Sequence, residues 1–429
     1  MLPQRQINGD VFAIPKFDLV KKDVNSFMEK LRGLHQDFHD CFQRSEPREN
    51  FFHYMVGQFS DLKRKSAEPI ALNVEDGNIR GIQRVLSDVH WDEPKMKFKY
   101  RSKINEDLGD ENGVMIFDES GFPKKGNKSV GVARQYCGAT GKVDNCQVGV
   151  FSAYASQHGY ALLDKRLFMP EKWFGEKYKK RRTKCKVPKD LKFKTKPQLA
   201  SEMLEEIDQE ASVPFKYVVA DTVYGDNPGF VKTIESIQKA VYFLSISCNT
   251  LCWLKEPMLV KKEYKYKGEK RVKSVLLNKD KKPIRVDKLA QNINDYFWYR
   301  RKVSEGTKGP IEYEFTKREI VVSRKELPDK RVWLIVKRTL DENPTYSYYI
   351  SNAPKSTRLK TFVWLSGVRW AIEQCFEEGK TELGMDQYEV RKYTGWNHHM
   401  LSCMLAHFFL WHLRITLGKK SAVYYSVAA

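Results

Sequence analysis

The chain has 429 residues, enough for two or three domains, and its 41% apolar and 30% charged residues exclude a disordered protein. No apolar run approaches the ~20 residues that span a bilayer, and no apolar leader opens the chain, so we expect neither membrane insertion nor secretion. The net charge of +21 favours a polyanionic partner such as nucleic acid, because each neutralised phosphate releases a counterion. Anionic lipid, ribosomal RNA or a surplus of Lys kept for solubility would explain the same charge.

The eight cysteines are spread along the chain without a CxxC pair. Cys248 and Cys252 lie close together, but no second pair of Cys or His lies near them in the sequence, so a zinc site is not expected. The pattern indicates reduced thiols, which are typical of a cytoplasmic protein.

Residues 1–105 are predicted to form a mostly helical domain, because apolar residues recur there at helical spacing. The predicted helices span residues 17–42, 46–62 and 76–89. Several short helices in a basic protein indicate a DNA-binding domain. No clear helix-turn-helix pattern is present, however, and a helical domain that only supports its neighbour would show the same periodicity.

Residues 106–249 change to short β-rich segments, which are later interrupted by helical ones. A run of strands followed by alternating helices and strands predicts a mixed α/β sheet. The predicted strands are 113–118, 135–137, 146–154, 160–168, 217–220 and 240–247, and the predicted helices are 198–209 and 227–238.

Residues 250–353 are predicted to be a β-rich insertion, because their segments alternate or are rich in β-branched and aromatic residues between charged turns. The chain then returns to the α/β core over residues 354–429. A long helix is expected from about residue 356 to 383, and an apolar helix over 394–417 closes the core.

Two stretches are strongly basic and contain aromatic residues. Residues 172–196 hold twelve Lys or Arg against two acids, and residues 255–282 hold eleven against four. Such stretches either form solvated loops or contact phosphate groups, with stacking of bases or ribose on the aromatic rings. The residues that we expect at DNA phosphates from such positions are Arg181 and Arg182 of the first stretch and Lys124 and Lys125 of an earlier turn.

Two aspartates follow predicted strands. Asp118 ends the segment 113–118, and Asp221 follows the segment 217–220. An isolated Asp at such a place usually caps a turn or helix, but the carboxyl ends of strands are also where ligand and metal sites collect.

The helix predicted over 356–383 offers a third acid, Glu373. Arg369, Glu373, Glu377 and Lys380 follow one another at spacings of four, four and three, so they share one helical face. Ordinary surface ion pairs would show the same spacing, but the many bulky apolar residues predict a buried helix whose charges need partners. Three such carboxylates can hold two divalent cations about 4 Å apart, the arrangement that cleaves a phosphodiester, and hard oxygen ligands favour Mg²⁺ or Mn²⁺.

Longer motifs carry a resemblance to a known family. The segments are FDESGFPKKGNKSVGVARQYCGATGKVDNCQVGVFSAYAS at 117–156, VVADTVYGDN at 218–227 and VRWAIEQCFEEGKTELGMDQYEVRKYTGWNHHM at 368–400. They resemble the bacterial insertion-sequence transposases of the DDE superfamily, which share an RNase H-like core. The last segment contains the family's R-x3-E-x6-K pattern. Ser366 stands where one branch of these enzymes has a Tyr.

The resemblance implies an RNase H-like mixed-sheet catalytic core with a β-rich insertion and an N-terminal helical domain that recognises the terminal inverted repeats. It implies that Asp118, Asp221 and Glu373 bind two Mg²⁺ or Mn²⁺ ions, and that Arg369 and Lys380 contact DNA near the cleaved bond. Such an enzyme cuts transposon-end DNA with water and joins the freed 3′-hydroxyl to target DNA. We expect it to act as a homodimer on DNA, in the bacterial cytoplasm at the nucleoid.

The sequence leaves two other functions open. The same fold serves repair and recombination endonucleases, which cut DNA without strand transfer. A domesticated regulator would bind DNA without cutting it. In relatives that form a hairpin, an insertion Trp holds a flipped base, and Trp253 and Trp298 are the residues to consider, although a place in the core explains either.

Overall fold

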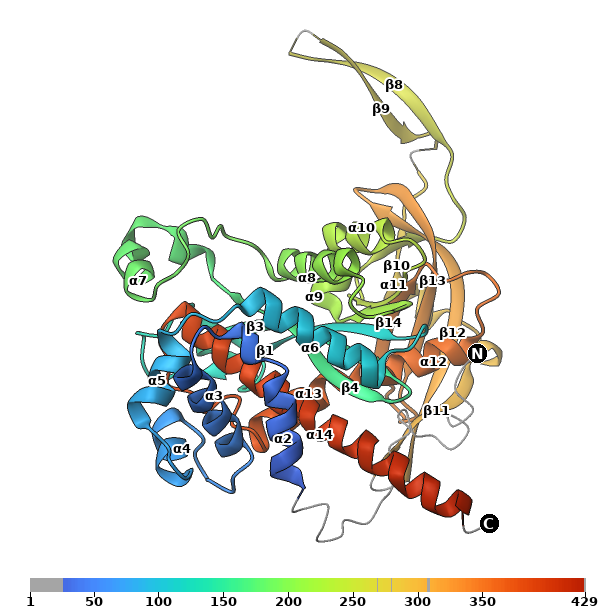
Figure 1. The fold of residues 1–429 in the computed structure, drawn as a ribbon. Coiled ribbons are helices and arrows are strands. Elements are labelled where there is room, and N and C mark those ends of the chain that lie inside the picture. Colours follow the sequence, from blue (N-terminus) through green and yellow to red (C-terminus); the bar gives the residue numbers. More distant parts are fainter. Residues whose placement is uncertain (1–25, 268, 279, 307–308, 428–429) are drawn as a thin grey trace. The chain divides into compact units, whose positions relative to one another are not determined.

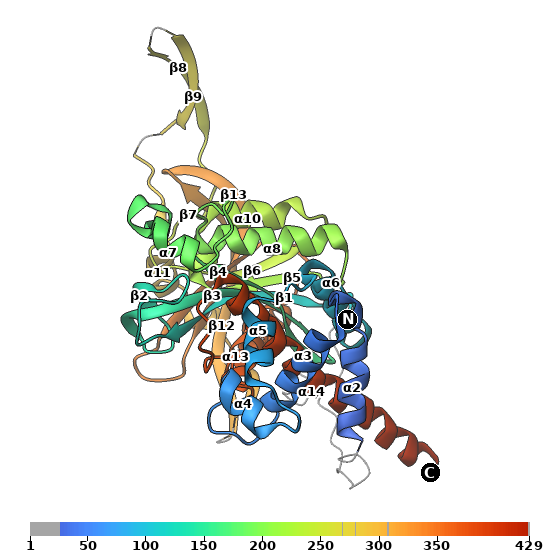
Figure 2. The same ribbon diagram turned by 60° about the vertical axis from the view of Figure 1, so that its left-hand side comes forward.

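The computed structural model describes residues 26–267, 269–278, 280–306 and 309–427 (Figures 1 and 2). They divide into two compact units. We call residues 26–216 together with 369–427 the β1 unit, and residues 217–368 the β5 unit. Each unit is described by itself.

The N-terminal part of the β1 unit is helical, as predicted. The predicted helices over 46–62 and 76–89 are confirmed, and the first one is shorter than predicted, with residues 17–25 outside the described part of the chain. The helices are α2 (Phe27–Gln36), α3 (Ser45–Gln58), α4 (Ala67–Asn73), α5 (Ile79–Ser87) and α6 (Glu93–Leu108). Buried rings of Phe51, Trp91 and Phe42 pack against one another between them.

The sheet of the β1 unit is antiparallel. Its strands are β1 (Val114–Pro123), β2 (Ala133–Cys137), β3 (Lys142–Ser156) and β4 (Gly159–Phe168). The long strand β3 pairs with β1 and, along different parts of its length, with β2 and β4. The helix α8 (Lys196–Glu210) follows, and it begins with a capping box in which Thr195 and Gln198 satisfy each other's backbone N–H groups.

The apolar helix predicted over 394–417 is part of α14 (Tyr393–Val427), which packs on β4 and on α3, α5 and α6. Residues Tyr393–Leu417 are long and apolar enough to cross a membrane, but 72% of the most apolar window is buried inside the protein. The burial explains the composition, because a helix covered on most sides by other elements is apolar around most of its surface.

A buried ion network joins β4 to α6 and α8. Asp164 of β4 is fully buried, and its Oδ2 accepts hydrogen bonds from Arg101 (2.6 Å) and Arg166 (2.7 Å). The buried Arg101 also reaches Glu206 (3.0 Å) and Glu210 (2.5 Å) of α8. The positive charges around Asp164 hold the pKa of its carboxyl well below the usual value, although burial opposes this shift.

Three buried histidines make the β1 unit sensitive to acid. Burial lowers the pKa of His35, His398 and His399 to about 4, from 6.5. His398 stacks on Trp91 with ring centroids 3.9 Å apart, and its Nδ1 lies 2.9 Å from the Leu86 carbonyl oxygen. These groups are neutral in the folded protein, whereas the unfolded chain binds protons on them below pH 6.5.

The stability of the β1 unit is therefore expected to be complete above pH 6.5 and to fall progressively as the pH drops from 6.5 to 4. A pKa lowered from 6.5 to about 4 corresponds to roughly 3 kcal/mol for each histidine. Urea unfolding followed by Trp fluorescence between pH 7.5 and 4 measures the loss. The exposed His158 provides the control variant His158→Gln, which should keep the same profile. A loss that begins only below pH 4 would assign the effect to carboxylates instead.

The β5 unit contains the parallel strand pair and the predicted β-rich segments. Strands β5 (Tyr217–Ala220) and β6 (Val241–Ile246) are parallel and are connected through α9 (Thr222–Gly225) and α10 (Pro228–Ser236).

The other strands of the sheet in the β5 unit pair antiparallel in the order β10, β7, β12, β13, β14, β6, and β11 pairs with β12. They are β7 (Leu251–Trp253), β10 (Ile284–Arg285), β11 (Tyr299–Gly306), β12 (Gly309–Arg324), β13 (Leu327–Arg338) and β14 (Tyr346–Ser351). The short helix α11 (Val286–Gln291) follows β10. Parallel and antiparallel pairs in one sheet confirm the predicted mixed α/β class.

One local prediction was wrong in detail. The single helix expected over 356–383 is two helices, α12 (Leu359–Val368) and α13 (Trp370–Thr381), with Arg369 between them. The N-cap of α10 is Asn227, whose side chain accepts the N–H of Phe230. Asp226 accepts a hydrogen bond from the Ser247 N–H at 3.1 Å.

Trp253 and Trp298 are core residues of the β5 unit, with 5% and 7% of their surface exposed. The guanidinium of Arg338 lies 4.1 Å from the Trp298 ring centroid. The core interpretation of the two tryptophans is therefore confirmed in this structure, because a ring that receives a flipped base must be accessible.

Candidate active site

Asp118 lies on β1 inside the β1 unit. The predicted strand ended at this residue, but β1 continues to Pro123, so Asp118 sits within the strand, opposite Phe151 of β3. The four preceding residues of the strand are buried, and the Asp118 side chain is 16% exposed. The apolar residues thus fix the backbone, while the carboxylate emerges at the edge of the core.

Arg369 brings two predicted site residues together. One guanidinium nitrogen lies 3.2 Å from Asp118 Oδ2, and the other donates to Glu373 Oε1 one turn along α13. Asp118 and Arg369 are 251 residues apart in the chain. The planar guanidinium presents its donors in a fixed fork, so it orients both carboxylates and offsets their mutual repulsion.

Glu373 is more exposed than the sequence predicted. Helix α13 is buried along the face that carries Ile372, Cys375 and Phe376, whereas the Glu373 side chain is 48% exposed. The helix is thus buried along one face only, and Glu373 has the partner that the sequence predicted, Arg369. The exposure of Glu373 leaves the carboxylate accessible to a ligand from solvent, and its place near the start of α13 lets the helix dipole favour its negative charge.

Asp221 belongs to the β5 unit and directly follows the buried strand β5, as predicted. Its backbone is extended, and its Oδ1 accepts the N–H of Val223 at 3.0 Å, so the residue is the N-cap of α9. The capping role that the sequence left open is thus observed. A carboxylate has about four lone-pair sites, so one capping bond is compatible with a metal ligand.

The chemistry of these residues fits a hard divalent cation. The predicted ligands offer only carboxylate oxygens, the donors that Mg²⁺ and Mn²⁺ prefer. Asp118 Oδ1 already accepts the Glu119 N–H at 2.8 Å, which fixes the rotation of the carboxylate about its Cα–Cβ bond. Two of the three acids share one guanidinium in the β1 unit, and the third stands at the end of a strand.

Other acids near these residues have structural partners. Glu119 Oε1 accepts a hydrogen bond from Lys196 of α8 at 2.5 Å. Glu378 accepts from the hydroxyl of Tyr160 at 2.8 Å and lies 2.7 Å from Nε2 of the buried His407. Glu377, by contrast, is exposed on α13.

Two predicted lysines meet at a pair of aromatic rings. Lys124 Nζ lies 3.5 Å from the Tyr388 ring centroid, and Lys380 Nζ lies 5.5 Å from that of Phe122. The two rings are 5.9 Å apart. Burial lowers the pKa of Lys124 to about 8 and also lowers the pKa of Lys380. Lys124 is therefore packed against protein rather than extended into solvent, whereas Lys125 is exposed.

The predicted arginines of the first basic stretch lie on the short helix α7 (Lys179–Lys184). The Arg181 guanidinium lies 4.7 Å from the Trp173 ring centroid, and the Arg182 guanidinium lies 5.7 Å from that of Phe174. Both side chains are half-buried. The aromatic residues of this stretch therefore hold its cations by packing under them, a role that the sequence did not distinguish from base stacking.

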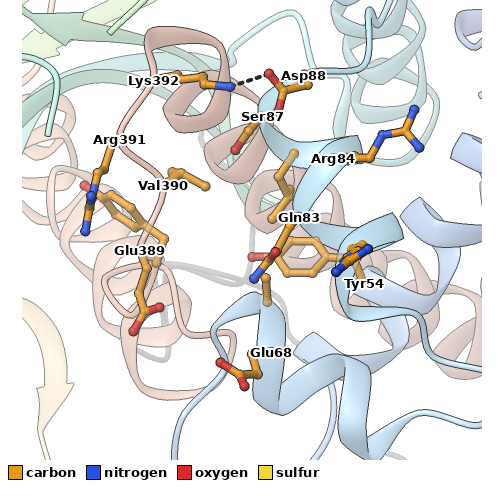
Figure 3. Close-up of a pocket in the computed structure, with 14 residues that line it drawn as sticks. Tyr54, Glu68, Gln83, Arg84, Ser87, Asp88, Glu389, Val390, Arg391 and Lys392 are labelled. Carbon is orange, nitrogen blue, oxygen red and sulfur yellow. Dashed lines mark hydrogen bonds and ion pairs between the residues drawn. The ribbon is translucent and has the colours of Figure 1, made fainter. Parts of the chain in front are cut away.

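A cavity of about 500 Å³ lies in the helical part of the β1 unit. Figure 3 shows it between α5 and the loop 388–392, with Arg84 at one side and Arg391 at the other. The ion pair of Lys392 with Asp88 closes one end of the lining. Arg80 and Arg84 are on the exposed face of α5, whose other face is buried.

A family model and a relative known by sequence agree on the kind of protein that this chain resembles. A family model described as DDE superfamily endonuclease matches residues 37–310. A protein of Microchaete diplosiphon, named a probable transposase for insertion sequence element IS701, is 26% identical over 348 residues, covering 80% of this chain and 77% of that protein. Among solved structures, the NurA nuclease of Sulfolobus solfataricus covers 69% of this chain and 86% of its own at 11% identity. Its TM-score of 0.28 is too low to support an argument.

Proposed function

Because this chain belongs to the DDE superfamily of endonucleases, we propose that it is a transposase, which cuts DNA at the ends of an insertion sequence and joins them to target DNA. The superfamily has an RNase H-like core. The order of elements here agrees with it: antiparallel β1, β3 and β4, then α8, then the parallel strands β5 and β6. The name of the Microchaete relative supports the narrower assignment to transposition.

One observation carries the proposal. Asp118 and Glu373, which are far apart in the sequence, bind the same guanidinium of Arg369. Structural ion pairs also join distant residues, but Arg369 bridges two residues that the family resemblance assigns to one catalytic triad. Two carboxylates that could bind a divalent cation, next to a guanidinium that can bind phosphate, suit the cleavage of DNA.

Asp221 completes the proposed triad. The Lys216 N–H donates to the Gly113 carbonyl oxygen at 2.9 Å, one residue before β5 and β1 begin. Asp221 is five residues after Lys216 (221 − 216), and Asp118 is five residues after Gly113 (118 − 113). Each carboxylate thus stands at the same distance along the chain from this hydrogen-bonded pair, and the family resemblance is what assigns Asp221 to the triad.

In the proposed mechanism, Asp118, Asp221 and Glu373 would hold two divalent cations. The bound cations supply Lewis acidity and lower the pKa of bound water, which phosphodiester cleavage needs at neutral pH. Arg369 keeps the first and last carboxylates oriented and donates hydrogen bonds to phosphate oxygens of the DNA. Lys380, on the same helix as Glu373, adds positive charge for the DNA backbone.

A strand-transfer assay tests the function. The protein is incubated with Mg²⁺, a plasmid that carries the two ends of the element, and a second plasmid as target. Cleavage at the ends, followed by joining of a labelled 3′ end to the target, is the expected result. Cleavage without joining would favour a repair or recombination endonuclease, and binding without cleavage would favour a regulator. Because both ends must be held together, the active form is proposed to be a homodimer on DNA.

The exposed face of α5 is proposed to contact the terminal repeats. Replacing Arg80 and Arg84 by Gln is expected to weaken binding of an end duplex at least about 30-fold, because each Arg at a base edge contributes roughly 1–3 kcal/mol of discrimination. A fluorescence anisotropy titration measures the loss. A scrambled duplex should lose much less, and Lys63→Gln, at an exposed lysine of the same region, should have little effect on either. Equal losses on both duplexes would exclude a role in recognition.

A further inference from the structure

The β5 unit carries a two-stranded hairpin whose described strand residues are almost all exposed. Strands β8 (Leu259–Tyr266) and β9 (Glu269–Leu276) pair only with each other, from Leu259 opposite Leu276 to Tyr266 opposite Glu269. Every residue of β8 is exposed, and β9 is exposed except at its last two residues, which are half-buried. Figures 1 and 2 show the hairpin extending away from the other strands of its unit. An isolated hairpin is only marginally stable in water.

Charge makes the hairpin less stable still. Between residues 259 and 276 there are seven Lys or Arg and two Glu, a net charge of +5 (7 − 2). Lys262 stands directly opposite Lys273, and Lys265 directly opposite Lys270. Like charges in directly opposed positions destabilise a strand pair. Formation of the hairpin therefore brings like charges together, and a bound polyanion would remove their repulsion.

Two tyrosines hold part of this charge in place. Tyr264 and Tyr266 lie on one face of the ribbon. Lys273 Nζ is 5.1 Å from the Tyr264 ring centroid, and the Arg271 guanidinium is 4.8 Å from that of Tyr266. Cations held over rings lose less conformational freedom when they meet an anion.

We propose that the β8–β9 hairpin is an arm that binds duplex DNA through its phosphates, without reading the base sequence. A two-stranded ribbon fits the major groove, and eight-residue strands at ~3.4 Å per residue span about 27 Å, most of one helical turn. Its lysines and arginine occur on both faces, so either face can meet a strand of the duplex. The inference rests on the proposed function in that DNA is the substrate, but it concerns a surface outside the catalytic residues.

The test replaces the two opposed lysine pairs, Lys262, Lys265, Lys270 and Lys273, by Gln. The change removes cross-strand repulsion, so the hairpin should remain folded. Binding to a duplex of unrelated sequence is measured in EDTA, over a range of salt concentrations. The matched control removes the same four charges at exposed lysines elsewhere in the β5 unit, by Gln at Lys232, Lys239, Lys325 and Lys360.

The hairpin variant is expected to bind the duplex at least tenfold more weakly near 150 mM salt, with a shallower salt dependence, since each lost phosphate contact reduces the slope by about 0.9. The control should change much less. Equal effects of the two variants, or tighter binding of single strands than of duplex by the native protein, would overturn the proposal. Because the assay needs no cleavage, a protein without nuclease activity would refute the proposed function and leave this inference standing. If the native protein cleaves DNA and the hairpin variant binds duplex as tightly as the native protein does, this inference is refuted and the proposed function stands.

Discussion

Replacing Asp118 by Asn, Asp221 by Asn or Glu373 by Gln is expected to reduce DNA strand cleavage at least about a thousandfold, while binding of end DNA is retained. Each change removes one negative charge from the proposed cation site with almost no change in shape. Metal-assisted stabilisation of the transition state supplies several kcal/mol, and about 4 kcal/mol corresponds to a thousandfold change in rate. Asn at 221 can still accept the Val223 N–H, so the cap of α9 is preserved.

The matched control for these variants is Glu377→Gln, one turn beyond Glu373 on the same helix and also exposed. Cleavage is measured as nicking of supercoiled plasmid in Mg²⁺ and in Mn²⁺, and end binding is measured in EDTA. The control should cleave within about twofold of the native protein. Full cleavage by the Asp221→Asn protein would contradict the triad assignment, and loss of cleavage in Glu377→Gln would move the third ligand along α13.

Replacing Asp164 by Asn is expected to destabilise the β1 unit by about 3 kcal/mol, because the buried Arg101 loses its fully buried carboxylate partner and keeps only the partly exposed Glu206 and Glu210. Lys97 and Arg166 lose the same partner. The folded-state pKa of Asp164 lies below its unfolded value, so this stabilisation is present above pH 4 and is lost as the pH falls below it.

Urea unfolding at pH 7 measures the effect of the Asp164 variant as a shift of the midpoint. The exposed ion pair of Glu389 with Arg64 provides the comparison, and Glu389→Gln should change the stability by no more than about 1 kcal/mol. If both variants change the midpoint equally, the buried network contributes nothing beyond ordinary surface charge. Since β4 pairs with β3, and β3 with the strand that carries Asp118, this network also supports the candidate site.

The sequence alone was sufficient to predict those features that depend on residues close together in the chain. The apolar run before Asp221 predicts a buried strand that ends in a carboxylate, and β5 and its cap on α9 have this form. The spacing that placed Glu373 on one helical face with Arg369 also holds, because it depends only on the helical repeat. Membership of the DDE superfamily was evident from motifs of the same kind.

Tertiary structure decided what depends on residues far apart in the sequence. Only folding brings Arg369 to Asp118, and only the packing of α6 and α8 on β4 shows why a fully charged Asp164 is buried there. The residues 255–282 were recognised as basic, but the strand register decides which lysines stand opposite each other, and a one-residue shift would change every pair. Periodicity and motif spacing act within a few turns of chain, whereas contacts between distant residues are set by how whole elements pack.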